Sequence, residues 1–196
     1  NNGKGIDGVA DNVRIMMLRV VPDGDEYDKD IALAIRYAVD HGAKVINMSF
    51  GGSNTTCPIP LQNLITRLVE KNVVMVASAG NENGQITDPA VCDGVISVGA
   101  TTHDGLKSGF SNYGTNATIY APGGNSNATE GIQVASNTGT ENPLNTFIVS
   151  SDIGTSFSSP IVAGVVANML AANPGLTPAQ VESILKNTAR PFRNTA

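Results

Sequence analysis

A cluster of hydroxyl side chains precedes an apolar stretch near the carboxyl end of the chain. The segment GTSFSSP, residues 154–160, holds one threonine and three serines, and the apolar run IVAGVVANMLAA follows it directly. This pattern predicts a helix from about Thr155 to Ala172. The cluster has two interpretations. Thr155 or Ser156 can be an ordinary N-cap with serines filling the first turns, or one hydroxyl can be a nucleophile at the head of the helix.

A second polar group follows a predicted buried strand. The apolar run VVMVASA, residues 73–79, leads into GNENG, in which Asn81 stands beside Gly80. This segment can be a simple turn. It can also be a catalytic feature, because open α/β sheets bind ligands beyond the carboxyl ends of their strands. An asparagine amide placed there would donate hydrogen bonds into the crevice.

The elements that must position these groups alternate along the chain. Helical periodicity in 28–42 and 60–72 separates apolar runs of strand length, and GLTPAQVESILKNTA supplies a last helix capped by Thr177 with Pro178 at its first position. Short extended pieces and turns occupy the region between about 105 and 152. The predicted strands are 13–20, 44–50, 73–79 and 94–100. This order predicts a three-layer αβα fold with a mainly parallel sheet.

Composition excludes several other classes of protein. The 196 residues carry a net charge of −5 with no cluster among 12 Lys and Arg, which argues against a nucleic-acid partner. The apolar run at 161–172 is too short for a bilayer, so no membrane partner is expected. GKGIDG fits the spacing of a dinucleotide fingerprint, but no strand precedes it, and we expect no cofactor.

Two cysteines bear on the compartment in which the protein works. Cys57 and Cys92 lack the spacing of a zinc site, so no metal site is assigned. They are either two inert thiols or one disulfide. Their settings in turns that look exposed favour the disulfide, which predicts a protein that works outside the reducing cytosol.

Four motifs together resemble the subtilisin-like serine proteases, and they occur in the order of that family. These motifs are INMSFGG, SAGNENG, FSNYG with APGG, and GTSFSSP, and the resemblance extends from about Gly8 to about Pro191. It implies a subtilisin-like fold and a serine endopeptidase. Ser156 matches the nucleophile, and Asn81 matches the side-chain donor of the oxyanion hole, which the Ser156 backbone N–H completes.

The resemblance also implies a substrate cleft with two walls. An extended protein or peptide substrate would bind between them as an added strand, and Glu82 matches a position near the rim of the specificity pocket. The residues of the two walls are Ser49, Phe50 and Gly51 on one side and Ser78, Ala79 and Gly80 on the other.

The family's histidine and aspartate motifs do not occur in this chain. The only histidines, His41 and His103, lie in other contexts, and we expect structural roles for them. The family order is Asp, His, Ser, and GKGIDGVADNVRIMMLRV resembles the segment after the histidine helix. The resemblance therefore implies that residues 1–196 are the C-terminal two-thirds of a single peptidase domain and are close to inactive alone.

Other implications concern the environment of the whole protein. The family suggests secretion and a prodomain, and it leaves calcium open, because the segment before APGG has Thr118 at the position where some members carry an aspartate. The alternative function is a non-catalytic module that binds peptides. An upstream D-[ST]-G motif and an H-G-T-like motif would favour the enzyme.

Overall fold

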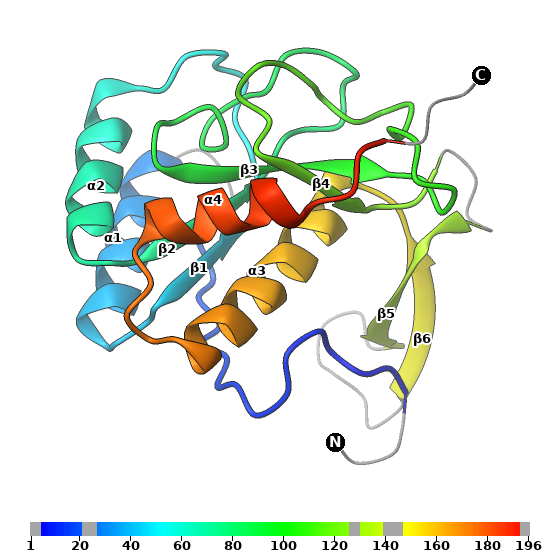
Figure 1. Ribbon diagram of the computed structural model, residues 1–196, viewed down its shortest axis with the longest axis horizontal. Coiled ribbons are helices and arrows are strands. Elements are labelled where there is room, and N and C mark those ends of the chain that lie inside the picture. The colour runs from blue at the N-terminus through cyan, green and yellow to red at the C-terminus, as the bar shows by residue number, and fades with distance from the viewer. Residues whose placement is uncertain (1–4, 21–26, 126–129, 139–146, 193–196) are drawn as a thin grey trace.

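The computed structural model describes residues 5–20, 27–125, 130–138 and 147–192. Within these ranges the chain forms a four-stranded parallel sheet, a two-stranded antiparallel hairpin and four helices (Figure 1). The elements in chain order are α1 (Tyr27–Asp40), β1 (Val45–Met48), α2 (Ile59–Glu70), β2 (Val74–Ser78), β3 (Val95–Thr101), β4 (Ile119–Pro122), β5 (Ile132–Asn137), β6 (Phe147–Asp152), α3 (Thr155–Ala172) and α4 (Pro178–Thr188).

The parallel sheet, in the order β1-β2-β3-β4, lies between two layers of helices. Successive side chains of a strand point to opposite faces, and the interior strand β2 shows this clearly. Met75 and Ala77 pack into a core with α1 and α2. Val74 and Val76 pack into a second core with α3 and α4, which cross the front of the sheet in Figure 1. The predicted three-layer fold is confirmed.

The carboxyl edge of the sheet gathers the segments that carry the candidate groups. Met48 pairs with Ala77 and Ser78 pairs with Val98, so β1 and β2 end side by side. The chain returns to this edge after β6, where Gly154 donates its N–H to the carbonyl of Gly123 just before α3 begins. Parallel pairing therefore brings segments more than 70 residues apart in sequence to one edge.

Helix α3 is the central helix of one layer. It contacts all four strands of the parallel sheet, and Val162 and Val166 are buried in the core on that face. By length and composition alone α3 could cross a membrane. Its position against the sheet accounts for the apolar side that carries Val162 and Val166, because the central helix of a layered fold must bury such a side.

The predicted strand at residues 13–20 does not form. The segment has no regular secondary structure, and Ile15 and Met17 are 78% and 85% exposed. A strand needs a neighbour for its backbone hydrogen bonds. Within the described residues, β1 pairs only with β2, and no strand lies beside the other edge of β1. The apolar pattern alone is therefore insufficient to make this strand.

Candidate active site

The side chain of Asn81 is fixed to the first residue of α3. Its Oδ1 accepts hydrogen bonds from the backbone N–H and the hydroxyl of Thr155, both at 2.9 Å. The same hydroxyl accepts the N–H of Gly80 at 3.2 Å. Thr155 is fully buried, whereas Asn81 is exposed. Because both bonds hold the amide oxygen, the Asn81 Nδ2 group is left to donate elsewhere.

Two hydrogen-bond donors remain free beside Ser156. In the part of the chain that the structure describes, neither Asn81 Nδ2 nor the Ser156 backbone N–H has a partner. Ser156 is the second residue of α3, where the N–H cannot bond within the helix. A Cβ built on Gly154 would lie 3.7 Å from both amide atoms of Asn81, which places that side chain against the head of the helix. The structure thus brings Ser156 and Asn81 together.

A row of hydrogen bonds connects the end of β1 to the first turn of α3. The Ser49 hydroxyl donates to the carbonyl of Ser156 at 2.8 Å and accepts the Asn47 side-chain amide at 2.9 Å. Asn47 in turn accepts the hydroxyl of Ser159 at 2.7 Å. The Ser156 hydroxyl itself makes only a long contact of 3.4 Å to the Ser49 carbonyl. The backbone of Ser156 is therefore held while its side chain is weakly engaged.

The residues of the two predicted cleft walls differ in accessibility. Ser78 and Ala79 are buried, and Gly80 is half-buried, so the accessible part of this wall begins at Gly80. On the other side Phe50 is half-buried and Gly51 is exposed. Phe50 and Gly51 also border a cavity of about 790 Å³ between α1 and α2. No residue of α3 lines this cavity.

Glu82 lies next to the amide donor rather than apart from it. Its side chain is exposed, and Oε2 accepts the backbone N–H of Asn81 at 2.8 Å. The same oxygen accepts the side-chain amide of Asn112 at 2.8 Å. The carboxylate predicted near the specificity pocket therefore also holds the backbone of the residue that carries the donor.

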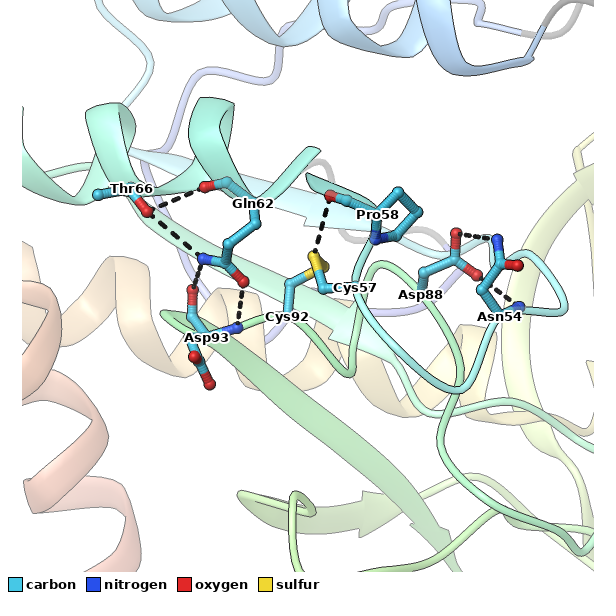
Figure 2. The surroundings of a disulfide bond; sticks show 8 residues. All are labelled: Asn54, Cys57, Pro58, Gln62, Thr66, Asp88, Cys92 and Asp93. Carbon is cyan, nitrogen blue, oxygen red and sulfur yellow. Dashed lines mark hydrogen bonds between the residues drawn. A yellow bond between two sulfur atoms is a disulfide. The ribbon is translucent and has the colours of Figure 1, made fainter. Parts of the chain in front are cut away.

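The two cysteines form a disulfide that secures the loop beyond Gly51 (Figure 2). Cys57 and Cys92 connect the turn before α2 to the β2–β3 loop. On one side, Asp93 and Gln62 exchange two hydrogen bonds of 2.9 and 3.0 Å. On the other, the buried carboxylate of Asp88 accepts the backbone N–H of Asn54 at 3.0 Å and the Asn54 side-chain amide at 3.3 Å. The Asp88 carbonyl accepts the N–H of Gly52, so the disulfide and Asp88 together hold this wall.

Neither histidine is hydrogen-bonded to Ser156. His41 follows α1 at the amino edge of the sheet, with Nδ1 2.8 Å from the Tyr37 carbonyl and its ring stacked on Tyr37. His103 lies exposed in the turn after β3. Among the described residues no group of three or more His, Cys, Asp or Glu side chains could hold a metal ion. The calcium question and the expectation of no cofactor stay untested predictions.

Comparison with known proteins identifies the family. The family model described as the subtilase family, Peptidase_S8, matches residues 1–196. The chain belongs to the subtilase family. This subtilase chain is 38% identical over 203 residues to an extracellular protease of Xanthomonas campestris pv. campestris, covering 97% of the chain and 34% of that protein. It is 37% identical over 198 residues to a thermophilic serine proteinase of Bacillus sp. (strain AK1), covering 100% of the chain and 45% of that protein.

Solved structures agree with the subtilase fold. A protease from Pseudoalteromonas arctica superimposes with a TM-score of 0.91 at 37% identity, over 98% of this chain and 60% of that one. A cold-adapted subtilisin-like serine proteinase superimposes with a TM-score of 0.75 at 29% identity, over 93% and 62%. The subtilase chain thus spans about a third to a half of those two curated relatives and about three-fifths of the solved chains.

Two residues of the candidate site were missed by the sequence interpretation. Thr155 was considered only as an N-cap, whereas Gly154 is the N-cap and Thr155 binds Asn81. Asn112, in the motif FSNYG, was not assigned a role. Their positions in the sequence could have indicated a role, because Thr155 directly precedes the candidate nucleophile and Asn112 lies inside a family motif.

Proposed function

We propose that residues 1–196 are the C-terminal two-thirds of a single subtilisin-like peptidase domain, and that the whole protein is a serine endopeptidase. The observation that supports this most is the fixed orientation of Asn81. Because Thr155 holds the amide oxygen through two bonds of 2.9 Å, the donor end of the amide is already directed before any substrate binds. Catalysis by electrostatic stabilisation depends on such preorganised donors.

The proposed reaction uses the residues in distinct roles. Ser156 Oγ attacks the carbon of the scissile carbonyl group. The negative charge that develops on the carbonyl oxygen is stabilised by Asn81 Nδ2 and the Ser156 N–H. The carbon–nitrogen bond then breaks to leave an acyl-enzyme on Ser156, and the serine proton passes through a histidine to the departing amine. Water hydrolyses the ester and regenerates the serine.

The aspartate and histidine of the triad would come from an upstream segment of the same protein. No histidine bonds to Ser156 in the described residues. One edge of β1 has no neighbouring strand there, and the segment 13–20 exposes Ile15 and Met17. A strand entering at this edge would supply the missing neighbour. Without the triad partners, the isolated chain should be slower by several orders of magnitude.

Hydrogen exchange in the full-length protein tests this arrangement. We expect the amides of residues 13–20 to be protected to a similar degree as those of β1, because both would lie in the completed sheet. Exchange of residues 13–20 as fast as that of the turn at 103–105 would contradict it.

The substrate and location follow from the same family. Protein or peptide substrates would pair with the backbone of Phe50–Gly51 on one side and Gly80 on the other. Relatives named as extracellular proteases, together with the disulfide, support a secreted protein. A prodomain is part of the proposal by family analogy alone.

The decisive experiment is covalent labelling of the full-length protein with a fluorophosphonate probe, followed by mapping of the modified peptide. We expect label on Ser156, cleavage of a denatured protein substrate, and loss of both in Ser156→Ala. Ser53→Ala, which removes an exposed hydroxyl in the nearby loop, is the matched control and should keep both activities. Folded protein without label on Ser156 would exclude the peptidase and favour the non-catalytic peptide-binding module.

A further inference from the structure

Asn112 is a buried residue whose side-chain hydrogen bonds all go to the loop that carries Asn81. The residue is 1% exposed and lies between β3 and β4. Its Oδ1 accepts the backbone N–H groups of Glu82 and Gly84, both at 2.9 Å, and its Nδ2 donates to the Glu82 carboxylate at 2.8 Å. Its own backbone N–H donates to the carbonyl of Gly80 at 3.0 Å.

These bonds lead through Glu82 to the oxyanion donor. Glu82 Oε2, which accepts Nδ2 of Asn112, also accepts the backbone N–H of Asn81 at 2.8 Å. Asn112 therefore orients the carboxylate that holds the Asn81 backbone, while Thr155 holds the end of the Asn81 side chain. Asn81 is therefore held at its backbone N–H by Glu82 and at its side-chain oxygen by Thr155, which belong to two different parts of the fold.

The contacts require an amide at position 112. One end of the side chain must accept two N–H groups, and the other must donate to a carboxylate; of the side chains of this length and shape, only asparagine does both. Gly80 is adapted to it, because a Cβ at that position would overlap Nδ2 of Asn112. An aspartate at position 112 has the same shape, but it would place one of its own carboxylate oxygens where Nδ2 lies, 2.8 Å from Glu82 Oε2. The two negative charges would repel each other there.

We propose that Asn112 is a positioning residue for catalysis, acting through Glu82 on the oxyanion donor Asn81. The inference rests on the proposed peptidase function. Asn112 has no hydrogen bond to Ser156, but it bonds to Gly80 of the predicted wall and to Glu82 near the predicted pocket rim. An effect that acts through the oxyanion donor lowers kcat, whereas a displaced Gly80 or Glu82 would raise KM. An error of about 1 Å in the position of a catalytic group can lower the rate by about 100-fold.

The test is a double-mutant cycle between Asn112→Asp and Asn81→Ala in the full-length protease. With Asn81 present, we expect Asn112→Asp to lower kcat by about 10- to 100-fold and to leave KM within about threefold of the parent. With Asn81 replaced by Ala, we expect Asn112→Asp to lower kcat less than about threefold, because the donor is already gone. Equal losses in the two backgrounds would show a general structural role and overturn the proposal.

Two further variants complete the test. Asn116→Asp makes the same change at an exposed asparagine of the same connection and should leave kcat unchanged. Glu82→Ala removes the intermediate carboxylate from an exposed position, so it tests the proposal if Asn112→Asp does not fold. We expect Glu82→Ala to lower kcat by about 3- to 10-fold, again only when Asn81 is present; an unchanged kcat in that variant would overturn the proposal.

The outcomes for this inference and for the proposed function can be told apart. A parent protein that takes no fluorophosphonate label on Ser156 and cleaves no peptide refutes the peptidase, and this inference with it. A parent that does both, while Asn112→Asp and Glu82→Ala keep the parent kcat, refutes the positioning role alone.

Discussion

Replacing Thr155 by valine should cost both stability and turnover, although the two side chains have nearly the same shape. The hydroxyl makes two contacts, one to Asn81 Oδ1 at 2.9 Å and one from the Gly80 N–H at 3.2 Å. Thr155 is fully buried, so the Gly80 N–H would be left without a partner, at a cost of about 1–3 kcal/mol. The lost bond to Asn81 adds roughly 1 kcal/mol. We expect the free energy of unfolding to fall by about 2–4 kcal/mol.

The effect on turnover has a separate upper limit. Valine leaves the bond from the backbone N–H of residue 155 to Asn81 Oδ1 in place, so the amide loses one of its two anchors. Loss of an entire oxyanion donor lowers turnover by about 10²- to 10³-fold, a figure measured in a subtilisin, which is a member of this family. We expect a fall in kcat of about tenfold, within that limit.

Two measurements on matched variants decide this prediction. Unfolding in urea should be followed in a Ser156→Ala background, which prevents self-digestion, and kcat should be measured with Ser156 present. Thr155→Ser keeps the hydroxyl and loses only a methyl group, so it should cost about 1 kcal/mol and leave kcat close to that of the parent. The reasoning would be refuted if valine and serine at position 155 gave the same stability and the same turnover.

Three further changes have definite expected outcomes. Replacing both Cys57 and Cys92 by serine opens a loop with a sequence separation of 35 and should lower the free energy of unfolding by about 4 kcal/mol, which scanning calorimetry would detect as a lower Tm. Burial raises the pKa of Tyr120 above 10.0. The contribution of Tyr120 to the free energy of unfolding is therefore complete below pH 10 and is lost as the pH rises through the raised pKa. Urea unfolding at alkaline pH should show that the free energy of unfolding of Tyr120→Phe falls less steeply with pH than that of the parent. Gly80→Ala combines a φ of 108° with overlap of the Asn112 side chain, and thermal unfolding should show a loss of about 2 kcal/mol or more, whereas no loss would mean that the loop adapts.

Local sequence patterns predicted the helices well, because each helix depends on residues close together in the chain. The expected helix 28–42 is Tyr27–Asp40, and 60–72 is Ile59–Glu70. Thr177 caps α4 as predicted, and the structure adds the reciprocal bond, in which the Thr177 backbone N–H donates to Gln180 Oε1. The ends shift by one or two residues, since the final turn depends on which backbone groups find partners.

Contacts between distant segments could not be predicted from local patterns. Short extended pieces are predicted between about 105 and 152, but the antiparallel pairing of β5 with β6 in this region depends on which strands meet in the folded chain. The strand expected at 13–20 failed for the same reason. Its residues have the apolar pattern of a strand, yet the described structure offers no neighbouring strand.

The candidate site shows where the limit of sequence reasoning lies. Periodicity placed Asn81 shortly after a strand and Ser156 in the first turn of a helix, and the resemblance to the family then assigned their roles. The direction in which the Asn81 amide points could not be predicted, because the two ends of an amide differ only in hydrogen bonding. The Thr155 hydroxyl, 74 residues away in sequence, donates to Oδ1 and so fixes the oxygen end of the amide, which leaves Nδ2 as the end that can donate elsewhere. The motif therefore supplies the donor, and a tertiary contact made by a different element determines whether the donor can serve.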